Sequence, residues 1–277
     1  MRTGISTYTF PWRMGGRAFA PESTPIPIPS LFERAKALPG VEVIQICDHP
    51  GLDALSETDS ANLRALAEKK GLALQIGTRG IDSERLTRHL AIAADLGAGL
   101  VRTILPMSGP GSDYGGAARL FREILPDYER KNIHLSLENH DKNPAAALRR
   151  LVEDVASPVF GICLDTVNSY GIGEDSRRIL DALAPVTNCF HAKDYRIGRI
   201  DCGLGFVLTG APAGEGMLNI PDILERFDRA GRRPDVILEQ WTPWRGSLAA
   251  TLVLEEEWAV KSVAYLAGVV RKVRTKS

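Results

Sequence analysis

Four carboxylate or imidazole side chains lie at the ends of apolar runs in the second half of the sequence. They are Glu138, Asp165, His191 and Glu239. A charge at the end of an apolar strand costs free energy unless it is paired or bound to a metal. A salt bridge at the rim of the fold would explain each residue alone. Three carboxylates brought together, however, repel one another unless a cation lies among them.

The types of these four residues narrow the identity of such a cation. Carboxylate oxygens with one imidazole nitrogen suit Mn²⁺ or Mg²⁺, and Co²⁺ or Zn²⁺ are also compatible. We therefore predict one bound divalent metal, with Mn or Mg favoured. Lys193 follows His191 by two residues and faces the same side of a strand. It would bind a substrate oxygen or pair with Glu138 or Asp165.

The elements that must position these residues alternate regularly along the chain. Eight apolar runs resemble strands buried on both faces of a parallel sheet, and they span residues 3–8, 41–47, 72–77, 100–105, 134–138, 160–165, 188–194 and 236–240. Between and after them lie segments of helical periodicity, at 60–70, 82–96, 114–130, 144–152, 175–183, 220–230 and 248–273. Eight strand–helix units predict an α/β fold, a single (β/α)₈ TIM barrel over residues 1–277. A doubly wound open sheet is disfavoured, because residues 9–17 lack a G-x-G-x-x-G phosphate loop.

Two loops and the last helix suggest further features of the substrate pocket and of possible subunit contacts. The proline-rich segment 10–29 would wall a substrate pocket with Phe10, Trp12 and Phe19, or would be a packed surface connection. The glycine-rich segment 203–216 leaves a phosphorylated sugar open as substrate. The helix near 248–273 packs on its own barrel or on a partner, which leaves a homo-oligomer open.

Composition excludes several classes of protein. Lys+Arg and Asp+Glu both number 34, so the net charge is +0, and we expect no nucleic-acid partner. No run reaches the ~18 consecutive apolar residues of a membrane-spanning helix, so we expect no membrane association. The N-terminus lacks the apolar core of a signal peptide. Without a C-x-x-C pair, Cys47, Cys163 and Cys189 are interpreted as buried, reduced thiols of a cytoplasmic protein.

Several short motifs, taken in order, resemble the xylose isomerase-like barrel superfamily of sugar isomerases and epimerases. They lie at 4–8, 137–140, 161–168, 191–194, 214–218 and 237–239. The resemblance implies one metal held by Glu138, Asp165, His191 and Glu239, and a small carbohydrate substrate. In the epimerase branch the two glutamates also move protons, which implies catalytic roles for Glu138 and Glu239. A metal on the substrate carbonyl would acidify the neighbouring C–H and stabilise the resulting enediolate.

The chain departs from the epimerase branch at two positions. Asn168 replaces a histidine that often follows the strand-6 aspartate; it would hydrogen-bond substrate but cannot act as an acid or base. An arginine usually follows the strand-7 histidine, and Arg196 is the candidate for that substrate-binding role.

A narrower resemblance points to a lyase. Segments 43–48, 77–80, 137–141, 205–207 and 210–214 are similar to a subgroup that includes 3-oxo-isoapionate decarboxylases. Arg79, Arg102 or His140 would then hold the substrate carboxylate, although both arginines are equally explained by rim salt bridges. Loss of CO₂ from a β-keto acid gives the same enolate as proton abstraction does.

The sequence thus predicts a metal-dependent isomerase or epimerase acting on a keto-sugar or sugar acid. The alternative is a lyase, a decarboxylase or dehydratase, on the same metal site. A DNA-repair endonuclease would need several more histidines than the five present. A non-catalytic sugar-binding barrel is disfavoured because all four expected ligands are intact.

Overall fold

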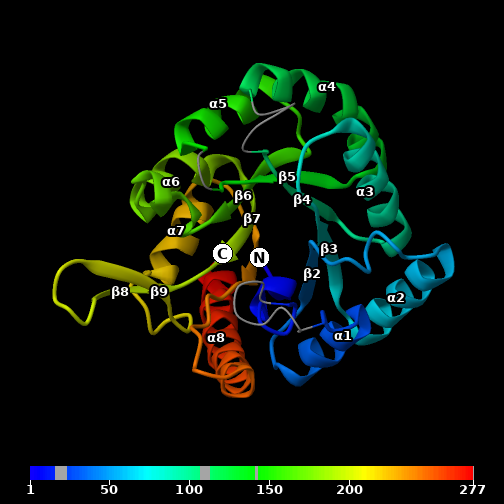
Figure 1. Ribbon diagram of the computed structural model, residues 1–277. Helices are drawn as coiled ribbons and strands as arrows, with labels where there is room; N and C mark the ends of the chain where they lie inside the picture. Colours follow the sequence, from blue (N-terminus) through cyan, green and yellow to red (C-terminus); the bar gives the residue numbers. More distant parts are fainter. Residues whose placement is uncertain (16–23, 107–112, 141–142, 277) are drawn as a thin grey trace.

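The computed structural model describes residues 1–15, 24–106, 113–140 and 143–276. Within these residues, parallel strands close into a barrel in the order β1-β10-β7-β6-β5-β4-β3-β2 (Figure 1). The strands are β1 (Thr3–Ser6), β2 (Val43–Cys47), β3 (Ala73–Gly77), β4 (Leu100–Ile104), β5 (His134–Glu138), β6 (Phe160–Asp165), β7 (Thr187–Ala192) and β10 (Asp235–Leu238). The prediction of a (β/α)₈ TIM barrel is confirmed.

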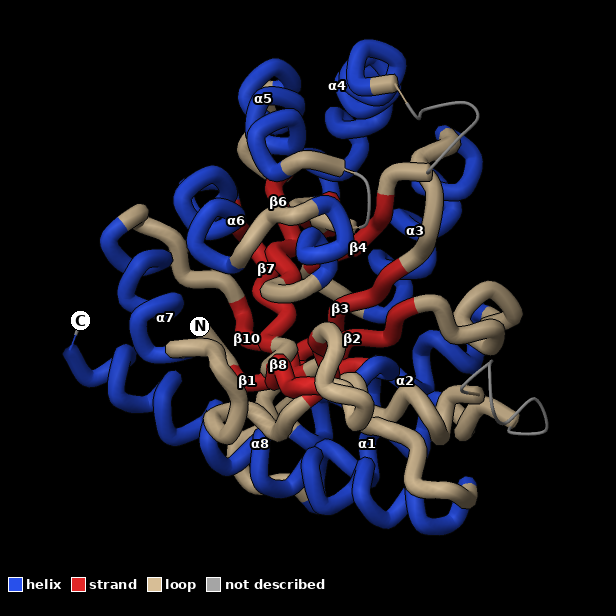
Figure 2. The backbone as a smooth tube through the Cα atoms, turned by 60° about the vertical axis from the view of Figure 1, so that its left-hand side comes forward, coloured by secondary structure: helices blue, strands red, loops and turns tan. Residues whose placement is uncertain are grey.

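Helices surround this ring of strands, as Figure 2 shows from a second direction. They are α1 (Ile28–Ala37), α2 (Glu57–Lys70), α3 (Ser83–Leu96), α4 (Tyr114–Lys131), α5 (Ala145–Val155), α6 (Ser176–Leu183), α7 (Ile220–Arg229) and α8 (Leu248–Lys276). Gly71 and Gly97 end α2 and α3 in the left-handed conformation, at φ 66° and 68°. An L side chain would be strained there, which confirms the predicted helix ends.

Helix α1 was not predicted, because the prolines around its start were interpreted as part of an extended loop over 10–29. Pro27 directly precedes the helix and Pro29 lies in its first turn. Proline is tolerated there, since the first N–H groups of a helix have no partner within the helix. Residues 16–23 of the predicted loop, with Phe19, lie outside the described residues.

The described part of that loop packs inward. Phe10 is fully buried, with the Arg34 guanidinium 4.9 Å from its ring centre. The Trp12 indole donates to the carbonyl of Thr242 at 2.7 Å, and its ring lies 5.3 Å from that of Trp244. These contacts are those of a packed connection.

An antiparallel hairpin, β8 (Tyr195–Arg199) and β9 (Phe206–Gly210), is inserted between β7 and α7. It projects from the barrel at the left of Figure 1. The segment 203–216, expected to be a loop, therefore contains a strand. Asp194 anchors both ends of the insertion, because its carboxylate accepts hydrogen bonds from the backbone N–H groups of Tyr195, Gly214, Gly216 and Leu218.

The chain ends meet where the barrel closes. β1 pairs with β10, and Arg2 forms an ion pair with Asp235 at 2.7 Å. The inward face of α8 buries Ala259, Val263 and Leu266 against the same region. Among the described residues, no helix combines the length and the apolar character needed to cross a membrane.

Candidate active site

The four residues with metal-ligand chemistry meet at one end of the barrel. Glu138 and Asp165 are the last residues of β5 and β6, His191 lies near the end of β7, and Glu239 directly follows β10. Strand register places Asp165 beside His191. All four side chains are buried, with exposed fractions of 3% or less. The carboxyl ends of barrel strands are where active sites of this fold form.

Their distances fit a shared cation. His191 Nδ1 lies 3.2 Å from Glu239 Oε1 and 3.8 Å from Glu138 Oε2. One ligand atom each of Glu138, Asp165 and His191 lie within 4.8 Å of one another. Each of the four residues also has one buried atom without a well-formed hydrogen bond, namely Glu138 Oε2, Asp165 Oδ2, His191 Nδ1 and Glu239 Oε1. Buried oxygen and imidazole donors at these distances suit a divalent metal, and in this structure Arg102 contacts Glu138 Oε2 and Lys193 contacts Asp165 Oδ2.

Lys193 supplies positive charge to this group. Its Nζ lies 2.7 Å from Asp165 Oδ2 and 2.9 Å from Glu239 Oε2. Burial disfavours the charged ammonium, but Asp165 and Glu239 outweigh burial and raise the pKa of Lys193. Burial alone would raise the pKa of Glu239, yet His191 and Lys193 hold it below its usual range. The carboxylate is therefore ionised at neutral pH.

Glu138 is held on both oxygens. The guanidinium of Arg102 contacts Oε2, and the amide of Asn168 donates to Oε1 at 2.7 Å. Both ends of the Arg102–Glu138 pair are 2% exposed. Proton uptake by Glu138 would break this buried ion pair and leave the guanidinium of Arg102 without that partner.

A second cluster extends from Arg102 to the rim. Arg102 NH1 lies 3.3 Å from Asp48 Oδ2, which also accepts hydrogen bonds from the hydroxyl of Tyr8 at 2.7 Å and from Arg79 Nε at 3.0 Å. Asp48 holds the left-handed conformation at φ 54°. The side chain of Arg79 is half exposed, at 51%, whereas that of Arg102 is fully enclosed. Arg79 is thus the more accessible arginine of this cluster.

A cavity of about 610 Å³ opens above these groups. Five of the expected substrate-binding residues line it, namely Arg79, Arg102, His140, Asn168 and Lys193, together with Glu138 and Glu239. The other lining residues include Tyr8, Tyr170, Leu208 and Trp241, which were not expected. Tyr8 and Trp241 adjoin segments that the sequence does single out, since Tyr8 ends the 4–8 motif and Trp241 follows Glu239 by two residues.

Arg196 does not line this cavity. It lies on the hairpin, and its guanidinium donates to the backbone carbonyl of Glu215 at 2.7 Å and 3.0 Å. Its side chain is 57% exposed. The hairpin carries it away from the barrel end, so Arg196 has no contact with the other candidate residues in the described structure.

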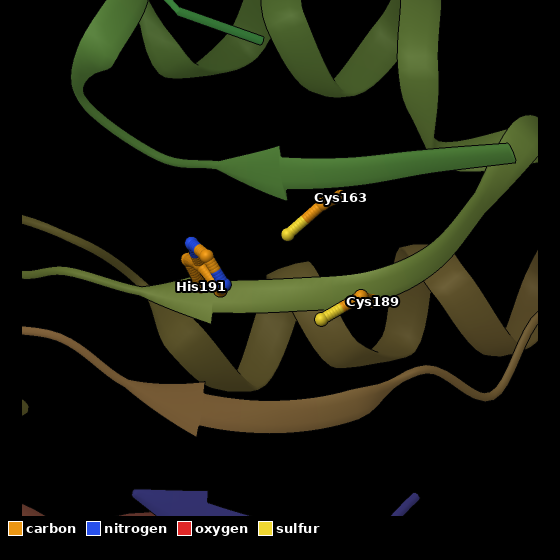
Figure 3. A group of neighbouring side chains, drawn as sticks. All are labelled: Cys163, Cys189 and His191. Carbon is orange, nitrogen blue, oxygen red and sulfur yellow. The ribbon is translucent and has the colours of Figure 1, made fainter. Parts of the chain in front are cut away.

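A group of softer ligands lies deeper in the barrel. Figure 3 shows Cys163 and Cys189 on neighbouring strands, with His191 farther along β7. The thiols of Cys47, Cys163 and Cys189 are buried and free of disulfides, as expected. The amide of Gln45 donates to Cys189 Sγ at 3.3 Å and its Oε1 lies 2.7 Å from His191 Nε2. Gln45 thus occupies Cys189 and the Nε2 side of His191, whereas Nδ1 faces Glu138 and Glu239, so the oxygen-rich group is the better candidate metal centre.

Comparison with known proteins identifies the family of this chain. The model of the xylose isomerase-like TIM barrel family matches residues 32–268. The chain belongs to this family. Among characterised relatives, the 3-oxo-isoapionate decarboxylase of Pectobacterium atrosepticum is 32% identical to this chain over 266 residues. The aligned residues cover 96% of this chain and 95% of the relative.

Solved structures agree on the fold of this xylose isomerase-like barrel. D-psicose 3-epimerase of Clostridium cellulolyticum H10, determined with D-tagatose, superposes with a TM-score of 0.71 at 16% identity and covers 98% of this chain and 99% of its own. A xylose isomerase-like TIM barrel protein of Mycobacterium smegmatis in complex with magnesium superposes with a TM-score of 0.66 at 18% identity. The match covers 96% of this chain and 97% of that protein. At these identities the likeness concerns architecture alone.

Proposed function

We propose that this protein is a metal-dependent decarboxylase of a small 3-oxo sugar acid. The geometry that supports the proposal is the engagement of Glu138 by Arg102 and Asn168. An isomerase or epimerase that uses both glutamates needs a free base at each position. Loss of CO₂ from a β-keto acid needs no base, because the C–C bond itself supplies the electron pair. The 32% identity to a 3-oxo-isoapionate decarboxylase supports the same reaction class.

In this proposal Glu138, Asp165, His191 and Glu239 hold one divalent ion. Mn²⁺ or Mg²⁺ suits the three carboxylates, and Co²⁺ or Zn²⁺ is compatible with the imidazole. When bound, the metal would polarise the keto group and stabilise the negative charge left by departing CO₂. The magnesium held by a relative of the same fold is consistent with this choice.

The protein's own groups orient the acid. We assign the substrate carboxylate to Arg79, whose guanidinium reaches the cavity and remains half exposed. The bond between the carboxyl carbon and the adjacent carbon breaks, and its electron pair becomes the enolate. The ammonium of Lys193, which lines the same cavity, donates a hydrogen bond to a substrate oxygen that gains charge. We assign the proton returned to carbon to His140, also on the cavity wall.

Isomerisation or epimerisation at the same site is the second candidate. The observation that favours it is that Glu138 and Glu239 both line the cavity. If a metal ion displaced Arg102 from Glu138, two carboxylates would be available for proton transfer. A ketose or keto acid without a β-carboxylate would then be the substrate.

One experiment separates the two candidates. Purified protein, with Mn²⁺ or Mg²⁺ added after metal removal, is incubated with 3-oxo-isoapionate, other 3-oxo sugar acids and simple ketoses in D₂O. CO₂ is followed by a coupled assay, and products are followed by NMR. Stoichiometric, metal-dependent CO₂ release supports the decarboxylase. Isomer formation with deuterium uptake and no CO₂ overturns it in favour of the second candidate. CO₂ release that is unchanged by metal removal overturns the metal-dependent mechanism.

A further inference from the structure

A line of hydrogen-bonded side chains runs through the barrel interior from His191 to the opposite end. His191 Nε2 lies 2.7 Å from Gln45 Oε1, and Gln45 Nε2 donates to Gln75 Oε1 at 3.0 Å. Gln75 Nε2 donates in turn to Asp235 Oδ2 at 3.0 Å. Gln45 and Gln75 are buried, at 0% and 4% exposure. Asp235 and Gln75 line a second cavity, of about 480 Å³, at the amino-terminal end of the strands.

Asp235, at the end of this line, determines how the side-chain amides of Gln75 and Gln45 are oriented. Asp235 forms an ion pair with Arg2 at 2.7 Å, and a carboxylate in an ion pair accepts hydrogen bonds and donates none. The NH₂ group of Gln75 must therefore face Asp235, which turns the Gln75 carbonyl toward Gln45. The NH₂ group of Gln45 must face that carbonyl, which turns the Gln45 carbonyl toward His191.

Two thiols reinforce the orientation of Gln45. Cys47 Sγ donates to Gln45 Oε1 at 3.3 Å, and Gln45 Nε2 donates to Cys189 Sγ at 3.3 Å. Figure 3 shows Cys189 on the same strand as His191. Rotating the Gln45 amide by 180° would oppose its NH₂ group to His191 Nε2–H and its carbonyl to the carbonyl of Gln75. The buried amide therefore has one favourable orientation.

We propose that the line Gln45–Gln75–Asp235 keeps the proton of His191 on Nε2 and leaves the Nδ1 lone pair for a metal ion. The inference rests on the proposed function, in which His191 is a metal ligand. His191 Nδ1 is the nitrogen that faces Glu138 and Glu239. A histidine ligand is oriented by the hydrogen bond that its other nitrogen donates. Gln45 is thus a positioning residue that acts through His191, and Asp235 acts on the metal centre from the far end of the barrel.

The first test measures metal affinity without any substrate. Metal-free wild type, Gln45→Leu, Gln45→Glu and Asp235→Asn are titrated with Mn²⁺ by calorimetry, with circular dichroism as the check of folding. Loss of such a partner typically weakens metal binding ~10–100-fold, and we expect that loss for Gln45→Leu. Gln45→Glu retains an acceptor for Nε2–H and should recover most of the affinity. Asp235→Asn should cost a few-fold, because an asparagine no longer dictates which end of Gln75 faces it.

Thr103→Val is the matched control. Its hydroxyl donates a buried hydrogen bond to the carbonyl of Gly80, away from His191. The control should bind Mn²⁺ as the wild type does. Equal affinity in wild type and Gln45→Leu would overturn the inference and leave the proposed function standing. A wild type that binds none of Mn²⁺, Mg²⁺, Co²⁺ or Zn²⁺ would overturn both.

The second test reports on the proton itself and needs only the wild type. The protein is labelled with ¹⁵N-histidine and loaded with diamagnetic Zn²⁺, and the His191 signal is assigned by its loss in His191→Gln. We expect the directly bonded proton on Nε2 and none on Nδ1. A proton on Nδ1 would overturn the inference even if Gln45→Leu failed to fold.

Discussion

Glu239 lies between the imidazole of His191 and the ammonium of Lys193, at 3.2 Å and 2.9 Å. Burial disfavours the charged carboxylate, but His191 and Lys193 lower its pKa and keep it ionised. A neutral amide of the same shape would leave both side chains without this partner. It would also remove one of the expected metal ligands.

Replacing this carboxylate should therefore stop the reaction. Glu239→Gln is expected to lower kcat by ~10²-fold or more and to weaken Mn²⁺ binding, with the circular dichroism spectrum unchanged. Glu215→Gln, at an exposed glutamate outside the cavity, is the control. Initial rates of CO₂ release measure the effect. Retention of wild-type turnover in Glu239→Gln would rule out its assigned role.

Arg79 offers a prediction with a different kinetic signature. A charge-assisted hydrogen bond contributes ~1.5–3 kcal/mol, so Arg79→Ala should raise KM ~10–100-fold with a smaller change in kcat. Arg88→Ala, at a 58% exposed arginine on α3, is the control. Competition by a substrate analogue that lacks the carboxylate tests the same contact. If Arg79→Ala bound acid and analogue with unchanged affinities, the carboxylate would lie elsewhere.

The sequence predicted the positions of side chains at strand ends better than the positions of side chains on loops. Glu138, Asp165 and His191 converge because parallel strands bring their carboxyl ends to one rim. Tyr8 and Trp241 were missed because aromatic residues next to strands are usually core residues. Arg196 was selected by its distance along the chain from His191, but the hairpin that begins at Tyr195 directs it away.

At the scale of elements, Asp194 is the residue on which the inserted hairpin depends. It is 1% exposed, and its four backbone donors belong to Tyr195 and to the segment that leads into α7. A methyl group at Gly216 would lie 2.1 Å from Asp194 Oδ1, so the carboxylate needs a glycine at that position. Hairpin and loop are thus held by one side chain.

Asp194→Ala should destabilise the protein by ~2–4 kcal/mol, because the buried backbone N–H groups lose their charged acceptor. We expect faster amide hydrogen exchange at Gly214, Gly216 and Leu218 than in the wild type, with the barrel strands protected. Asp201→Ala, an exposed aspartate of the hairpin, should change the stability by less than ~0.5 kcal/mol. Urea unfolding gives the free energies. Equal losses in the two variants would contradict the anchoring role.

The prediction of helices and strands failed where a proline or glycine is compatible with more than one local structure. Pro27 and Pro29 usually interrupt helices, but at the start of α1 they cost nothing. Gly203 and Gly205 do lie in the turn between β8 and β9, with positive φ, but the strand Phe206–Gly210 that follows them was not expected. The other helices were predictable because each must bury one face on the barrel. This requirement places apolar residues at helical spacing along the sequence.

At the scale of the whole molecule, the barrel is closed by contacts between its first and last units. The carboxylate of Glu255 on α8 accepts a hydrogen bond from the backbone N–H of Trp12 at 2.7 Å. Burial raises the pKa of Glu255 to about 7, although the backbone of Trp12 and Arg13 opposes the shift. The carboxyl group is therefore favoured in its protonated form where the two ends of the barrel meet.

This pKa makes stability depend on pH with a defined sign. The folded-state pKa exceeds the ordinary value of 4.5, so the stabilising contribution is complete below about 4.5 and is lost as the pH rises through about 7. Glu255→Gln removes the ionisation. Its stability relative to wild type should increase by up to about 3 kcal/mol between pH 4.5 and pH 8. Urea unfolding at several pH values measures this difference, with Glu257→Gln as an exposed control. A difference independent of pH would contradict the assignment.

The hairpin has a consequence for how this protein could diversify. Both strands of the hairpin are fully described, and they pair with each other and not with the barrel. Leu208, on β9, lines the cavity. Leu204 and Phe206 are exposed, at 82% and 66%, and contribute little to the core. We therefore expect the exposed turn of the hairpin to tolerate sequence change, and substitutions at Leu208 to alter the cavity wall without altering the strands that carry Glu138, Asp165 and His191.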